Sequence, residues 1–369
     1  MKPLPRPSIL NIEPYRGGEA ELPGVNRVIK LSSNEGALGP SPAAIEAYRR
    51  EACEIHRYPD GGASALRRAI AIVWNLDAER IVCGAGSDDL LCLLAQAYGG
   101  PGTETIVTRH AFAMYPIYAH YAGSTVVTVD EREYTADIDA ILAAVTARTS
   151  LVFLANPNNP TGTFVPWGEI VRLRQALPES VLLVLDLAYA EYLADPAVPE
   201  VIKLIDTTAN TVMTRTFSKI YALGGLRLGW AYAPKHVVDV LNRVRSPFNA
   251  SRPAQAAAIA ALADSDHFQA SRTHNFQMRA WLSEALESVG IPVRGTEGNF
   301  VVADFGSIGR SADAADQAFR ACGIIVRKLT GYGLPGMLRI TVGTPAEMEA
   351  VAEAAAKFMQ GFDRALSHA

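Results

Sequence analysis

The sequence predicts an α/β protein in which a large domain, with a mostly parallel seven-stranded sheet between helices, precedes a smaller α+β domain. Three observations predict this class. From about residue 64, short β-branched apolar runs alternate with longer stretches of helical periodicity, as strand-helix-strand units do. Near residue 254 a strong helix former, AQAAAIAALA, begins, and strand-like runs return only after a long helical segment. The chain has 369 residues, 49% of them hydrophobic, which suffices for two core-bearing units.

The predicted strands are short apolar runs. Those of the large sheet cover residues 81–83, 105–108, 125–129, 150–155, 181–185, 211–214 and 228–231. Those of the small domain cover residues 299–305, 323–328 and 337–342. The Pro- and Gly-rich amino terminus predicts an arm, residues 1–45, that packs on the small domain. The large domain then covers residues 46–260 and the small domain residues 261–369.

Composition and charge exclude several classes of protein. Lys and Arg number 34 against 38 Asp and Glu, a formal net charge of −4, and no basic block could neutralise a row of phosphates. We therefore expect no nucleic-acid partner. The 4 cysteines lack C-x-x-C spacing, which predicts buried thiols in a reducing compartment and no metal site. No run reaches the roughly 18 apolar residues of a membrane span, and no amino-terminal apolar segment occurs, so we expect a cytoplasmic protein.

The first polar segment with chemical potential is CGAGSDD, residues 83–89, between a predicted strand and a predicted helix. It lacks the third glycine of a dinucleotide-binding G-x-G-x-x-G, because Asp89 stands there. The segment still places the backbone amides of Ser87 and Asp88 at a helix amino terminus, where unpaired donors and the helix dipole favour an anion. A plain strand-to-helix turn explains the same residues.

Two further segments follow predicted strands. ANPNNPTGTF, residues 155–164, places Asn159 at the carboxyl edge of the sheet, where open α/β sheets bind ligands; as a bare Asn-Pro turn it is also ordinary. VLLVLDLAYAEY, residues 181–192, places Asp186 after five apolar residues, with Tyr189 three positions on. A buried carboxylate needs a positive partner, unless Asp186 caps a following helix.

The fourth segment is TFSKIYALGGLRLG, residues 216–229. The hydroxyls of Thr216 and Ser218 together with the Arg227 guanidinium suit an anion such as phosphate. Lys219, taken alone, would be a solvated surface lysine. The ordered combination of an Asn-Pro turn, a strand-end Asp, a Tyr and a Ser-Lys followed by Arg, each at the end of a separate strand, favours a shared site instead.

These four segments, in this order and spacing, resemble the aspartate aminotransferase superfamily, the fold type I pyridoxal-phosphate enzymes. More narrowly, LSSNEGALGPSP (residues 31–42), HRYPDGGASALRRAIA (56–71) and YGLPGMLRITVGT (332–344) are similar to histidinol-phosphate aminotransferases. The similarity covers nearly the whole chain and depends on many dispersed motifs.

The resemblance implies a role for each matching residue around pyridoxal 5'-phosphate. Lys219 forms the Schiff base with the cofactor aldehyde, and Asp186 pairs with the pyridine nitrogen. Tyr189 and Asn159 bond the ring hydroxyl oxygen, and Phe112 stacks on the ring. The cofactor phosphate is assigned to Gly86, Ser87, Asp88, Thr216, Ser218 and Arg227, and to Tyr58 of the second subunit of a homodimer. On sequence alone, Tyr58 is only an aromatic residue before a proline turn.

Substrate recognition is implied in the same way. Arg339 corresponds to the residue that binds the substrate carboxylate, or the phosphate of histidinol phosphate, and Arg327 adds a second anion contact. Asn34 and Tyr15 complete the implied substrate-binding set. The chain departs from the family pattern at Gly36 and Ala37 and at residues 16–18, where Arg16, Gly17 and Gly18 stand, which implies altered contacts from the arm.

The expected function is transfer of an amino group between glutamate/2-oxoglutarate and histidinol phosphate/imidazole-acetol phosphate, in histidine biosynthesis, by a ping-pong mechanism. Three alternatives share the scaffold. An aromatic-amino-acid aminotransferase would use the same residues. A phosphothreonine decarboxylase would differ only in the bond that it cleaves. A cofactor-binding regulatory protein would need a basic DNA-binding extension, which the sequence lacks.

Overall fold

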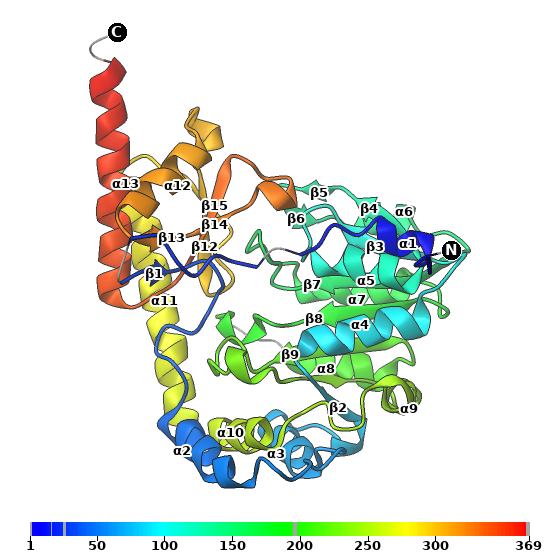
Figure 1. Ribbon diagram of the computed structural model, residues 1–369. Coiled ribbons are helices and arrows are strands. Elements are labelled where there is room, and N and C mark those ends of the chain that lie inside the picture. The colour runs from blue at the N-terminus through cyan, green and yellow to red at the C-terminus, as the bar shows by residue number, and fades with distance from the viewer. Residues whose placement is uncertain (1, 16, 25–26, 195–197, 367–369) are drawn as a thin grey trace.

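The computed structural model describes residues 2–15, 17–24, 27–194 and 198–366. Its centre is a seven-stranded sheet in the order β2-β10-β9-β8-β7-β3-β4 (Figure 1). The strands are β2 Ile81–Gly84, β3 Glu104–Thr108, β4 Thr125–Val129, β7 Thr149–Ala155, β8 Leu182–Asp186, β9 Thr211–Thr216 and β10 Gly229–Tyr232. All pairs are parallel except those of β10, which runs antiparallel to both β2 and β9. The predicted class and the seven predicted strands are confirmed.

The large sheet is buried on both faces because successive side chains of its strands point to opposite sides. Leu182 and Val184 join the core on the side of three helices, and Leu183 and Leu185 join the core on the other side. The first side is covered by α4 Ser87–Tyr98, α5 Met114–Ala122 and α9 Lys235–Val244. The second side is covered by α3 Ser64–Trp74, α6 Ile138–Ala143, α7 Trp167–Ala176, α8 Val198–Thr207 and α10 Arg252–Ala263.

A smaller, four-stranded antiparallel sheet follows in the order β11-β12-β15-β14. Its strands are β11 Val293–Arg294, β12 Phe300–Asp304, β14 Arg327–Lys328 and β15 Met337–Thr341. The helices α11 Ser265–Ser288, α12 Ala312–Ala321 and α13 Pro345–Leu366 lie around it (Figure 1). Val301 and Ala303 face the core that these helices form, whereas Phe300 and Val302 face the large-sheet core. The small sheet therefore connects the two halves of the molecule.

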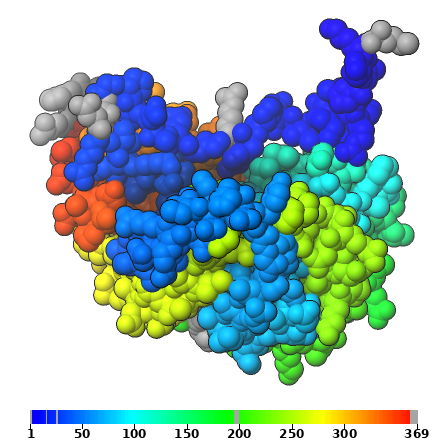
Figure 2. All heavy atoms as spheres, turned by 60° about the horizontal axis from the view of Figure 1, so that its bottom comes forward, coloured from blue at the N-terminus to red at the C-terminus, as the bar shows by residue number. Residues whose placement is uncertain are grey.

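The amino-terminal segment runs past both halves. Its short helix α1 Pro7–Leu10 lies beside α5 (Figure 1), and β1 Ile29–Lys30 pairs in parallel with β13 Ile324–Ile325. Residue Arg16 lies outside the described residues. The chain then enters α2 Pro42–Glu51, which packs against α10. Figure 2 brings the segment that holds α2 and α3 to the front, where it covers one face of the molecule.

Short one-turn helices and strand pairs complete the structure. They are η1 Ala52–Glu54, η2 Ala78–Arg80, η3 Ala190–Tyr192, η4 Gly224–Leu226, η5 Gly306–Ile308, η6 Thr330–Tyr332, β5 Glu131–Arg132 and β6 Thr135–Ala136. None of the helices in the described residues is both long and apolar enough to cross a membrane.

Two expectations need correction. The predicted strand 323–328 is two strands in two sheets, because β13 pairs with β1 and β14 pairs with β15. Thiol burial was wrong for Cys53 and Cys322, which are exposed, whereas Cys83 is buried. All four thiols are free.

Candidate active site

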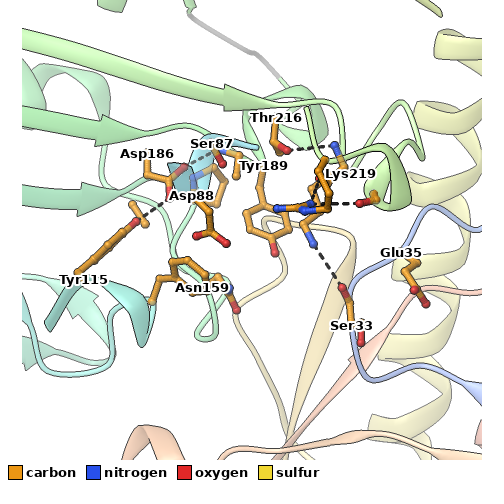
Figure 3. A pocket seen from close by; sticks show the side chains of 17 residues that line it. Ser33, Glu35, Ser87, Asp88, Tyr115, Asn159, Asp186, Tyr189, Thr216 and Lys219 are labelled. Carbon is orange, nitrogen blue, oxygen red and sulfur yellow. Dashed lines mark hydrogen bonds between the residues drawn. The ribbon is translucent and has the colours of Figure 1, made fainter. Parts of the chain in front are cut away.

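A cavity of about 270 Å³ opens at the carboxyl edge of the large sheet (Figure 3). Side chains reach it from the segments that follow β2, β3, β7, β8 and β9, whose carboxyl ends meet at that edge. Ten predicted site residues line it: Ser87, Asp88, Phe112, Asn159, Asp186, Tyr189, Thr216, Ser218, Lys219 and Arg227. The cavity thus gathers residues that are up to 140 positions apart in the sequence.

Asp186 is the buried carboxylate of the cavity, at the last position of β8. Its Oδ2 accepts a hydrogen bond from the Tyr115 hydroxyl at 2.8 Å. Its Oδ1 accepts from the Ala188 amide at 3.2 Å and from the Thr214 hydroxyl at 3.3 Å. Burial raises the pKa of Asp186 from 3.8 to about 6, and the Tyr115 hydrogen bond opposes that rise. The partners that the structure describes for this carboxylate are all neutral groups, so a cationic ligand would compensate its charge.

Lys219 approaches the same cavity from the segment after β9. Its Nζ donates to the backbone oxygen of Ser33 at 3.3 Å and lies 5.7 Å from the centre of the Tyr189 ring. Burial, followed by the positive charge of Arg339, lowers the pKa of Lys219 from 10.5 to about 8. A lowered pKa leaves a share of the amine neutral near neutral pH, and a neutral amine is the nucleophilic form.

Tyr189 and Asn159 face each other across the cavity near Lys219 (Figure 3). The Tyr189 ring is buried and meets the Phe300 ring edge to face at 5.5 Å between centres. Its hydroxyl accepts a hydrogen bond from Asn34 Nδ2 at 2.9 Å. Burial raises the pKa of Tyr189, so the hydroxyl keeps its proton at neutral pH.

The other end of the cavity is a cradle of hydrogen-bond donors. α4 begins at Ser87, and within the described residues no side chain caps its amino terminus. Arg227 stands beside it, with Nη2 2.6 Å from the place of a Cβ on Gly86, and the φ of +93° at residue 86 favours glycine there. Thr216 contributes a buried hydroxyl, and the Ser218 hydroxyl lies 3.4 Å from Arg227 Nη1. Amides, hydroxyls and a guanidinium suit a phosphate.

A second cavity of about 150 Å³ adjoins the first and shares Ser33, Phe112, Asn159, Tyr189 and Lys219 with it. Its own lining includes the four residues of the predicted substrate set: Tyr15, Asn34, Arg327 and Arg339. Arg327 on β14 and Arg339 on β15 are direct cross-strand partners, so both guanidinium groups leave the same face of the small sheet.

Arg339 is buried, with 5% of its surface exposed. Its Nη1 donates to Oδ1 of Asn159, and its Nη2 donates to the backbone oxygen of Ser32 at 3.0 Å. Within the described part of the chain, its Nε has no hydrogen-bond partner. Burial lowers the pKa of Arg339 because it disfavours the charged form of the guanidinium. A buried guanidinium with an unpaired donor favours an anionic ligand.

Tyr58 lies outside both cavities. Its side chain is 80% exposed and stacks on Phe248, with ring centres 4.5 Å apart. Sequence reasoning missed Tyr115, Ser33 and Glu35, which also line the first cavity. Tyr115 follows the predicted Phe112 by only three positions, and this nearness in sequence could have indicated it. Among the described residues, no group of His, Cys, Asp and Glu side chains could hold a metal ion.

An α/β fold with a strand-end Asp, a Lys and an anion cradle around one cavity is the arrangement of the class I and II aminotransferases, whose family model matches residues 26–354. The histidinol-phosphate aminotransferase of Granulibacter bethesdensis is 56% identical over 97% of this chain and 96% of its own length. That of Rhodospirillum rubrum is 54% identical over 98% of each chain. The chain belongs to the histidinol-phosphate aminotransferase family, as the resemblance indicated.

A solved structure supports the same assignment of fold. The histidinol-phosphate aminotransferase from Sinorhizobium meliloti, solved in complex with pyridoxal-5'-phosphate, is 30% identical and superposes with a TM-score of 0.89. The match covers 96% of this chain and 97% of that one.

Proposed function

We propose that the protein is a pyridoxal-phosphate-dependent aminotransferase of histidine biosynthesis, which transfers an amino group between glutamate/2-oxoglutarate and histidinol phosphate/imidazole-acetol phosphate. One observation carries the proposal: a single cavity is lined by an amine, Lys219, a buried carboxylate, Asp186, and a phosphate-type cradle. The 56% identity to a histidinol-phosphate aminotransferase over nearly the full length supports the substrate assignment.

The residues present fit pyridoxal 5'-phosphate. The cradle formed by the amino terminus of α4, Thr216, Ser218 and Arg227 offers donors for its phosphate. The described partners of the Asp186 carboxylate are neutral, and the pyridinium nitrogen would supply a cation. Phe112 offers a ring face, and Tyr189 and Asn159 offer hydrogen bonds to the ring oxygen.

When bound, pyridoxal phosphate supplies an aldehyde for the amine and a ring that accepts electrons from the substrate. Lys219 would hold the cofactor through Nζ, and its free amine would accept and return the proton of the substrate carbon. Its pKa of about 8 suits that role, because the amine can both hold and release a proton near neutral pH.

Asp186 would keep the ring nitrogen protonated, since its negative charge compensates that of a buried cation. Tyr115 and Thr214 hold the carboxylate in place through their hydroxyls. Tyr189 would donate to the ring oxygen. Asn159 would contact the same oxygen, and because its Oδ1 accepts from Arg339 it connects the cofactor site with the substrate site.

Arg339 binds the substrate anion, and Arg327, its cross-strand partner, adds a second contact. A guanidinium can hold either the carboxylate of glutamate or the phosphate of histidinol phosphate through paired hydrogen bonds, so one site serves both half-reactions. Asn34 and Tyr15 line the same cavity, and a substrate contact by either stays a prediction.

The protein acts as a homodimer in which Tyr58 reaches the cofactor phosphate of the other subunit. The exposed aromatic pair of Tyr58 and Phe248, with the exposed Ile55 nearby in sequence, supports a partner surface here. The domain division at residues 45 and 260 and the cytoplasmic location stay predictions.

The proposal is tested by visible absorption and steady-state kinetics. The purified protein should show the absorption band of an enzyme-bound cofactor, and Lys219→Ala should lack it. With 2-oxoglutarate as acceptor, kcat/KM for histidinol phosphate should exceed that for phenylalanine; the reverse order would favour the aromatic-amino-acid alternative. Release of carbon dioxide in a single turnover would favour the decarboxylase.

A further inference from the structure

Asn34 occupies an unusual position beside the second cavity. It is fully buried and has φ of 55°, in the left-handed region where Asn is more readily accommodated than most residues. Two polar contacts hold its backbone: its N–H donates to Thr341 Oγ1 at 3.0 Å, and its carbonyl oxygen accepts from Asn299 Nδ2 at 3.0 Å. The backbone conformation is therefore fixed by side chains of the small-sheet half.

Thr341 also sets the orientation of the Asn34 amide. The Thr341 oxygen already accepts the Asn34 backbone N–H, so its single proton is available for the Asn34 side chain. That proton goes to Oδ1 at 3.1 Å. With Oδ1 bound to Thr341, the NH₂ group faces Tyr189 and donates to its hydroxyl at 2.9 Å. A flipped amide would leave the Thr341 proton without this acceptor and would turn the Tyr189 hydroxyl from acceptor into donor.

This arrangement decides the role of the Tyr189 hydroxyl. Because the hydroxyl oxygen accepts from Asn34, its own proton must point elsewhere. Phe300 holds the ring edge to face, and Figure 3 shows the ring in the space between Asn159 and Lys219. The direction left for the Tyr189 hydroxyl proton is therefore toward the cavity.

We propose that Asn34 is a positioning residue which, locked by Thr341, makes Tyr189 a hydrogen-bond donor toward the ring oxygen of the bound cofactor. The inference rests on the proposed function and gives Asn34 a role distinct from substrate contact. Thr341 lies two residues after Arg339 on β15, so the strand that carries the substrate-binding guanidinium also sets the polarity of Tyr189.

The first test uses a pair of ligands that differ only in the ring hydroxyl: pyridoxal 5'-phosphate and its 3-deoxy analogue. The wild-type chain should bind the 3-deoxy analogue more weakly, by about tenfold for each of the hydrogen bonds from Tyr189 and Asn159. In Asn34→Asp, a carboxylate replaces the donor, so Tyr189 should donate to residue 34 and the preference should fall about tenfold, to the part that Asn159 supplies. An Asn34→Asp chain that keeps the wild-type preference overturns the proposal.

The second test is the pH at which the visible band of the cofactor-loaded protein changes from its acid to its alkaline form. A donor to the ring oxygen stabilises its negative charge and should lower that pH, so Asn34→Asp and Tyr189→Phe should each raise it by about one unit. The double variant should rise by less than the sum of the two single rises, because the hydrogen bond of Asn34 acts through Tyr189 and can be lost only once, whereas the new carboxylate acts by its own charge. Additive rises contradict the inference. The charged groups Arg339, Asp186, Asp88 and Lys219, which also act on Tyr189, remain present in all these variants.

Thr341 variants keep the test decisive if Asn34→Asp fails to fold. Thr341→Val removes the hydroxyl that orients the Asn34 amide and nearly keeps the shape of the side chain. It should reproduce part of the rise in the pH of the spectral change that Asn34→Asp causes. Thr341→Ser keeps the hydroxyl and should behave like the wild-type chain. Equal behaviour of the Val and Ser variants overturns the proposal. Failure of the wild-type chain to bind pyridoxal phosphate at all would instead contradict the proposed function, and with it this inference.

Discussion

The Tyr115 hydroxyl donates to Oδ2 of Asp186 at 2.8 Å, and both side chains are buried. Tyr115 cannot easily turn away, because its ring stacks on Phe153 at 4.9 Å between centres and meets Phe112 edge to face at 5.6 Å. The residue that stacks on the proposed cofactor ring and the residue that holds its carboxylate partner are thus packed together.

Tyr115→Phe should raise the pKa of Asp186 above about 6, because it removes a hydrogen bond to the ionised carboxylate. We expect the affinity for pyridoxal phosphate to fall about tenfold at pH 6 and less at pH 8. Equilibrium binding of pyridoxal phosphate between pH 6 and pH 8 measures the loss of affinity. The ligand's own protonation changes affect both proteins equally, so they cancel in the comparison. Tyr121→Phe, on the exposed side of the same helix, is the matched control. A uniform loss at all pH values would contradict a role through ionisation.

Asp186→Asn should stabilise the protein without cofactor at neutral pH while abolishing transamination. The folded-state pKa of Asp186 is raised, so the wild-type chain has its full stability below the unfolded value of 3.8 and loses it as pH rises through about 6. At about 1.4 kcal/mol per pH unit, the loss is about 3 kcal/mol. The Asn side chain avoids that loss and can still accept from Tyr115.

Urea unfolding of both cofactor-free chains checks this prediction. The difference in unfolding free energy between Asp186→Asn and wild type should be smallest near pH 4 and largest above pH 7. A wild-type chain that is equally or more stable than Asp186→Asn at pH 7.5 would show that the carboxylate already has a compensating cation.

Arg339→Lys should lower kcat/KM for glutamate and for histidinol phosphate alike, each by about 100-fold, because an ammonium group cannot make paired hydrogen bonds to an oxyanion. The control is Arg294→Lys, on the neighbouring part of the same sheet, where Arg294 pairs with Asp304. Arg294→Lys should leave both values unchanged. A loss confined to one substrate would mean that the two anions occupy different sites.

Tyr58→Ala should weaken cofactor binding, and mixed dimers should show that it acts across the interface. Coexpression of Tyr58→Ala with Lys219→Ala chains produces hybrids in which one site has both native residues and the other has neither. Activity well above that of either variant alone is expected from the hybrid. No recovery would place Tyr58 in its own subunit's site or outside both.

The large sheet could be predicted because each buried strand leaves a compact apolar run, and all seven runs coincide with observed strands to within two residues. The antiparallel direction of β10 could not be predicted, since the periodicity of a strand does not show which way the strand runs. Strands β1 and β13 have only two residues each, too few for any alternation. Their pairing depends on contacts almost 300 residues apart.

The residues of the site were predictable where a polar side chain interrupts an apolar run, as Asp186 does, or where family motifs apply. Tyr115 was not predicted because it lies among apolar and aromatic residues of α5, and its hydrogen-bond partner Asp186 is 71 positions away in the sequence. The direction of the Asn34 hydrogen bonds depends on Thr341, 307 positions away, and only the folded structure brings the two together.

The most direct measurement is to reduce the cofactor-loaded protein with borohydride, digest it and map the modified peptide by mass spectrometry. Reduction makes the bond between the cofactor and its lysine permanent. A single pyridoxyl group on Lys219 is the expected result. A protein that binds the cofactor yet carries the modification on a different lysine, or on none, would contradict the assignment of Lys219 and the site built around it.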